Sequence, residues 1–82
     1  MAQTNFDSIL EIFRDESNPD TLRIVAAHDY SWGMAFVDPE KSYEVADEQE
    51  QFAKEMNSPK WISDAINTKG VTWYVKGDYH QT

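Results

Sequence analysis

Turn-forming residues divide this sequence into short segments, and that division limits which folds the chain can form. Proline follows a residue that commonly caps helices at three places, Asn18-Pro19, Asp38-Pro39 and Ser58-Pro59. The sequence has no cysteine, so neither disulfides nor thiolate metal sites brace the fold. A chain of 82 residues buries only roughly 60–65% of its unfolded surface. We therefore expect one domain, residues 1–82, with a single core.

The segment before the first proline is the clearest helix in the sequence. Phe6, Ile9, Leu10 and Phe13 recur at positions i, i+3, i+4 and i+7, which places them on one face of a helix. Residues 17–20, Ser-Asn-Pro-Asp, are typical of a turn and predict the end of this helix.

Three short runs after this helix favour strands. Residues 21–27 and 32–37 are rich in apolar and β-branched residues, and residues 42–45 alternate polar with apolar. Residues 38–41, Asp-Pro-Glu-Lys, are typical of a type I turn and predict a hairpin between the last two runs. Residues 28–31, His-Asp-Tyr-Ser, are then expected to form the loop that joins the first two strands.

The remaining sequence predicts two helices and a final strand. Asp47 with Glu50 can open a helix, and Ser58-Pro59 is a typical start of another, which Gly70 would end. Residues 71–75, Val-Thr-Trp-Tyr-Val, have the strongest strand propensity in the chain. The predicted fold class is α+β, in the order α-β-β-β-α-α-β. It consists of a small antiparallel sheet of about four strands with helices packed on one face.

An all-helical fold, with a helix starting at each proline, remains the alternative. The prolines are spaced twenty residues apart, but the segments they bound match too poorly to be repeats. Gly33 and the β-branched runs around it would make poor helix, and this favours the α+β interpretation.

Acidic residues are concentrated in two stretches of a chain whose net charge is −8. Residues 1–20 have a net charge of −4, and residues 38–55 have a net charge of −5. Such a surface repels the phosphates of nucleic acids and membranes and attracts basic protein surfaces. The predicted partner-binding residues are Glu40, Glu44, Asp47, Glu48, Glu50 and Glu55, with Tyr30 and Trp32 as aromatic anchors and with Asp7, Glu11 and Asp15 as a second acidic patch.

The leading functional hypothesis is an acidic, non-enzymatic inhibitor that masks the basic surface of a nucleic-acid-binding protein. It could act as a nucleic-acid mimic, as a viral counter-defence protein would. The competing interpretation of the charge is that it only keeps a small protein in solution. The alternative function is a protein–protein adaptor that uses residues 71–75 as an aromatic strand edge. We expect no direct contact with nucleic acid or membrane, and a cytoplasmic location. The oligomeric state is not indicated.

Catalytic, metal and cofactor sites are not predicted. His28-Asp29 and Asp78 with His80 could each supply a general base, but no thiol, Gly-x-Ser-x-Gly motif or His-x-x-x-His pair completes a site. The carboxylates of Asp47, Glu48 and Glu50 lack the spacing of a calcium-binding loop.

Overall fold

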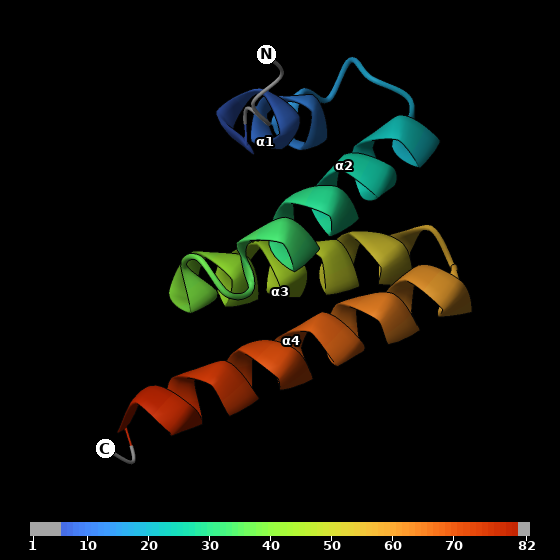
Figure 1. The fold of residues 1–82 in the computed structure, drawn as a ribbon. Helices are drawn as coiled ribbons and strands as arrows, with labels where there is room; N and C mark the ends of the chain where they lie inside the picture. The colour runs from blue at the N-terminus through green and yellow to red at the C-terminus, as the bar shows by residue number, and fades with distance from the viewer. Residues whose placement is uncertain (1–5, 81–82) are drawn as a thin grey trace.

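The computed structural model describes residues 6–80, with side chains described up to Gly77, and over this range the chain is all-helical (Figure 1). Its elements are α1 (Phe6–Arg14), α2 (Asp20–Met34), α3 (Pro39–Glu55) and α4 (Pro59–His80). Helix α3 packs against both α2 and α4, and α1 lies on α2. The body is flat, with Cα extents of 44 × 35 × 16 Å. Within the described residues, no helix combines the length and apolar character needed to cross a membrane.

The prediction of an α+β fold is wrong, since residues 6–80 contain no strand and no sheet. The runs at residues 21–27 and 32–37 belong to α2 and to the turn after it. Within α2 the buried side chains Ile24, Ala27 and Ser31 are three and four residues apart, which is the helical period. Packing of this face overrides the strand propensity of Thr21, Ile24 and Val25.

Gly33 argued against a helix, yet it lies in α2, and an aromatic ring occupies the space where its side chain would stand. A Cβ atom at this position would lie only 2.6 Å from Phe6 Cε1. The same ring meets Tyr30 edge-on, with 6.0 Å between ring centroids. Residues 28–31, predicted as a loop, are therefore in the middle of the helix against which α1 packs.

Asp38-Pro39 begins α3 and does not form the predicted hairpin turn. The Asp38 side chain accepts a hydrogen bond from the backbone N–H of Lys41 at 3.2 Å, and Pro39 occupies the first helical turn. Residues 42–45, predicted as a strand, are thus in α3, and the helix predicted from Asp47 begins at Pro39. The alternative with a helix at each proline describes the observed element order.

A left-handed residue at the end of α3 reverses the chain direction. Asn57 has φ 56°, and its N–H donates to Lys54 O at 3.1 Å. The next N–H, that of Ser58, donates to Ala53 O at 3.0 Å, which completes a Schellman motif. Pro59 then starts α4, as the sequence predicted, and α4 returns along α3 (Figure 1).

The strand predicted at residues 71–75 is wrong because α4 continues through Gly70 to His80. Its buried face includes Thr68 and Thr72, whereas Trp73 is 67% exposed and Tyr74 is 71% exposed. Neither aromatic residue is in the core. Polar residues face inward and aromatic residues face outward, so the apolar pattern of this segment did not reveal a helix.

Two different interiors hold the four helices together. Between α1, α2 and α3 an apolar cluster includes Phe13, Tyr30 and Val45, with the predicted stripe of α1 packed against it. Between α2, α3 and α4 the interior consists of small and polar side chains. The fully buried Gln49 lies 3.2 Å from Ser31 Oγ and donates from Nε2 to Trp61 O at 3.3 Å. One α3 side chain thereby contacts α2 and α4 together.

Replacing Gln49 tests how much this polar interior contributes to stability. Gln49→Met keeps the side-chain size but leaves Trp61 O and Ser31 Oγ without their shared partner, so the free energy of unfolding should fall by about 1–3 kcal/mol. Urea denaturation measures the change. Gln51→Met, on the exposed side of the same helix, is the control and should stay within about 0.5 kcal/mol. Equal effects of the two substitutions would contradict the bridging role of Gln49.

Gly70→Ala tests whether residues 71–75 are helical. A Cβ at Gly70 meets nothing within 4 Å, so alanine should stabilise α4 by about 0.5–1 kcal/mol through helix propensity alone. Thermal unfolding followed by far-ultraviolet circular dichroism measures the gain. An unchanged or lower midpoint would indicate that this segment is not helical.

Candidate functional site

The acidic residues of α3 lie on its outer side. Glu40, Glu44, Glu48 and Glu55 are spaced by four or seven residues, and Asp47 follows Glu44 by three. All five therefore share one stripe of the helix. Glu48 is half-buried and the other four are exposed. These are five of the six acidic residues that the sequence predicted for partner binding.

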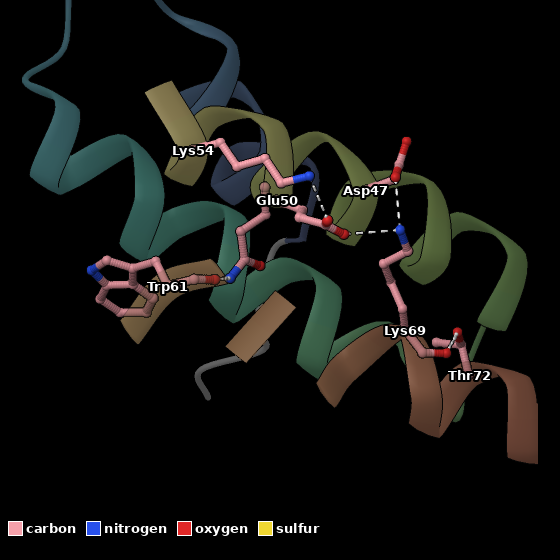
Figure 2. A network of polar contacts seen from close by, with 7 residues as sticks. Asp47, Glu50, Lys54, Trp61, Lys69 and Thr72 are labelled. Carbon is pink, nitrogen blue, oxygen red and sulfur yellow. Dashed lines mark hydrogen bonds and ion pairs between the residues drawn. The ribbon is translucent and has the colours of Figure 1, made fainter. Parts of the chain in front are cut away.

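Glu50, the sixth, faces α4 and is held in a network with Lys69 (Figure 2). Lys69 Nζ donates to Glu50 Oε1 at 3.0 Å and to Asp47 Oδ1 at 2.8 Å, while Lys54 Nζ pairs with Glu50 Oε2 at 3.0 Å. The Glu50 side chain is only 14% exposed. It serves to attach α4 to α3 more than to present charge to solvent.

The network changes the proton affinities of its members. Hydrogen bonds from Lys54 and Lys69 lower the pKa of Glu50 from its ordinary value of 4.5. The hydrogen bond to Asp47, supported by the one to Glu50, raises the pKa of Lys69 from its ordinary value of 10.5, although burial opposes this change. Both residues are therefore charged at neutral pH.

Helix α1 brings the N-terminal acidic stretch against α3. Arg14 Nη2 pairs with Glu48 Oε2 at 2.6 Å. Burial raises the pKa of Tyr30, and the charges of Asp7, Asp38 and Glu44 raise it further while Arg14 opposes them, so charges from both acidic stretches act on this one hydroxyl.

We call this surface the acidic face. It comprises nine carboxylates and five cations, with a net charge of −4. Asp7 and Glu11 belong to it because they lie seven and three residues before Arg14, on the same side of α1, and Asp38 belongs to it as the N-cap of α3. The other carboxylates are Glu40, Glu44, Asp47, Glu48, Glu50 and Glu55, and the cations are Arg14, Lys41, Lys54, Lys69 and Lys76. An open depression of about 510 Å³ lies on the acidic face, lined by Glu40, Tyr43, Glu44, Asp47, Glu48 and Lys76.

The cations of the chain are all engaged within the molecule. Each of the seven Lys and Arg side chains lies within 4 Å of a carboxylate or a backbone carbonyl oxygen. Arg23, which belongs to no ion pair in the described residues, donates from Nε to Phe13 O at 2.7 Å and stacks on the Phe52 ring. The surplus negative charge is thus presented to solvent without a competing basic patch.

The other predicted site residues are placed differently. Tyr30 is 3% exposed and packs in the apolar cluster, so it offers no surface anchor. Trp32 is partly exposed but stacks on His28, with 6.4 Å between ring centroids. Asp15 follows α1 and accepts hydrogen bonds from Ser17, which lower its pKa.

His28 and Asp29 are neighbours on α2. The His28 ring lies between Trp32 and Trp61, and its Nδ1 atom is buried without a hydrogen-bond partner among the described residues. Asp29 is exposed. The side chains of Asp78 and His80 lie outside those that the structure describes. Among the described side chains, no group of three His, Cys, Asp or Glu residues is arranged to hold a metal ion.

Sequence reasoning missed an aromatic notch at one edge of the acidic face, made by Tyr43, Trp73 and Lys76, with a volume of about 140 Å³. Trp73 was assigned to a strand, and Tyr43 to another. Ile62, Ile66 and Trp73, spaced by four and seven residues, would have signalled a second apolar side of α4 had the segment been interpreted as one helix.

Comparison of the chain with models of known protein families, with curated proteins and with solved structures finds no match.

The Lys69 network predicts a defined pH dependence of stability. Because the pKa of Glu50 is lowered on folding, its contribution is present above about pH 4.5 and is lost as the pH falls through its folded value. Because the pKa of Lys69 is raised, its contribution is present below about pH 10.5 and is lost at higher pH. Urea unfolding between pH 3 and pH 11 should show stability falling on both sides.

Lys69→Met should reduce the loss of stability at both low and high pH. It should also lower the free energy of unfolding at pH 7 by about 1–3 kcal/mol, since Asp47 and Glu50 lose a charged hydrogen-bond donor. Lys41→Met is the control, because Lys41 lies 3.9 Å from the exposed Glu44, and it should cost at most about 0.5 kcal/mol. If Lys69→Met left the pH profile of stability unchanged, the Lys69 network would not be the cause of that profile.

Proposed function

We propose that this protein binds a basic surface of another protein and masks it, and that the acidic face makes the contact. The observation that supports this most directly is the meeting of the two acidic stretches at Arg14 and Glu48, with every Lys and Arg side chain engaged internally. A face with a net negative charge steers a partner of opposite sign and accelerates association.

Basic surfaces of this kind are typical of nucleic-acid-binding proteins, whose Lys and Arg residues neutralise phosphates. The spaced carboxylates on the outer side of α3 offer a regular row of negative charges to such a surface. The proposal therefore includes competition with nucleic acid for the same site, as an inhibitor acting by mimicry would require.

An adaptor that binds through exposed aromatic residues is the second candidate. It is favoured by the exposure of Trp73 and Tyr74 on α4, where a helix face would replace the predicted strand edge. The two functions differ in salt dependence, because ionic contacts weaken with salt and aromatic burial does not.

Reversing three charges of the acidic face tests the proposal. The triple variant Glu40→Lys, Glu44→Lys and Glu55→Lys changes exposed residues whose ion pairs are absent or no shorter than 3.9 Å, so the fold should be kept. Tagged wild-type protein is used to capture a partner from cell extract, which is eluted with salt, identified and purified. Its binding to a fluorescent DNA duplex is then measured by polarisation. Wild-type protein should displace the duplex, and the triple variant should be weaker by on the order of tenfold or more.

The matched control carries the same change in charge elsewhere. Glu16→Lys, Asp20→Lys and Asp29→Lys alter exposed residues outside the acidic face, and this variant should inhibit nearly as well as the wild type. Inhibition that is insensitive to salt and to the Glu40, Glu44 and Glu55 reversal would refute the proposal and favour the aromatic adaptor.

A further inference from the structure

The aromatic notch is lined by an unpartnered tryptophan with Tyr43 and Lys76, and it adjoins the acidic depression. Trp73 is 67% exposed, and within residues 6–77 no ring or cation contact involves it. Tyr43 and Lys76 line both this notch and the larger acidic depression, so the two hollows adjoin. A tryptophan exposed on a protein surface is a frequent anchor of protein interfaces.

Other aromatic rings of the molecule already carry cations. Arg23 lies 4.6 Å from the centroid of Phe52, Lys60 lies 3.8 Å from that of Trp61, and Lys69 lies 5.0 Å from that of Tyr43. Trp73 provides the same kind of ring, next to a depression that Glu40 and Glu44 line, and no described cation lies over it, although Lys76 lines the same notch. Its surroundings therefore suit a cation supplied from outside.

Two carboxylates of the adjoining depression, Glu40 and Glu44, are loosely held. Lys76 lies 3.9 Å from Glu40, and Lys41 lies 3.9 Å from Glu44, both at the outer limit of an ion pair. The Glu40 side chain is 82% exposed. An incoming cation can replace Lys76 as the partner of Glu40 at little cost, because exposed pairs of this kind contribute at most about 1 kcal/mol.

We propose that the notch receives an arginine side chain of the basic partner, with the guanidinium stacked on Trp73 and hydrogen-bonded to Glu40 or Glu44. This inference rests on the proposed function and specifies which part of the acidic face selects its partner. The notch volume of about 140 Å³ fits one planar group and not a folded segment, since a cavity of about 150 Å³ accommodates a benzene molecule.

Arginine fits better than lysine for two physical reasons. The guanidinium is planar and weakly hydrated, so it stacks on an indole at lower desolvation cost than an ammonium group. It also presents parallel N–H donors that match a carboxylate. A purely electrostatic surface would not distinguish the two residues, so a preference for arginine is the signature of the notch.

The test compares hexa-arginine with hexa-lysine, two peptides of equal charge and length, at low salt. Binding is followed by fluorescence anisotropy and by the three indole N–H signals in nitrogen-15 NMR spectra, assigned with single Trp→Phe variants. We expect hexa-arginine to bind about three- to fivefold more tightly, as one cation–π contact would give, and to shift the Trp73 signal most.

Trp73→Ala should remove the preference for arginine. Tyr74→Ala is the matched control, because Tyr74 is equally exposed on the next position of α4 but does not line the notch, and it should keep the preference. The NMR measurement on wild-type protein remains decisive even if Trp73→Ala is poorly folded.

Equal affinities for the two peptides, or a shift confined to Trp32 or Trp61, would overturn the arginine site. If binding still weakened with salt and with the Glu40, Glu44 and Glu55 reversal, only this inference would fail and the acidic face would stand. Absence of binding to either peptide would also overturn the arginine site. The proposed function is tested separately, by displacement of duplex DNA from the purified partner.

Discussion

The arrangement of the helices depends on the buried amide of Gln49. Its oxygen lies beside Ser31 Oγ on α2, and its nitrogen donates to the Trp61 carbonyl at the start of α4. Ser31 O in turn accepts a hydrogen bond from Ser42 Oγ, so the polar groups of this interior satisfy one another. A buried amide left without partners would cost more free energy than the hydrogen bonds contribute, which restricts these helices to one relative placement.

Small and polar residues in this interior determine what α4 shows to solvent. Ala46 and Ala53 of α3 and Ala65 of α4 are fully buried, so the helices approach closely without large side chains between them. The buried hydroxyls of Thr68 and Thr72 bond to carbonyls of their own helix. With its inner face occupied in this way, α4 leaves the bulk of Trp73 on the outside. The notch is therefore a consequence of how α3 and α4 pack.

The sequence predicted features whose cause is local. The stripe of α1 and the start of α4 at Pro59 were readable because periodicity and capping depend on neighbouring residues. The strands at residues 21–27 and 71–75 were wrong because the α2 face and the two α4 threonines are buried by distant contacts that propensity does not record. Acidic residues of α3 were readable as charge. Their proximity to α1 and the exposed position of Trp73 could be seen only in the folded structure.

Charge and aromatic surface have complementary physical roles in this molecule. A carboxylate row raises the rate at which basic partners arrive, but exposed ion pairs discriminate poorly among them. A desolvated ring discriminates by shape and hydration. Lys69 connects the two features: it pairs with Asp47 on the acidic face and lies over the Tyr43 ring that lines the notch. The same side chain that attaches α4 to α3 thus joins the acidic face to the notch where we propose that an arginine binds.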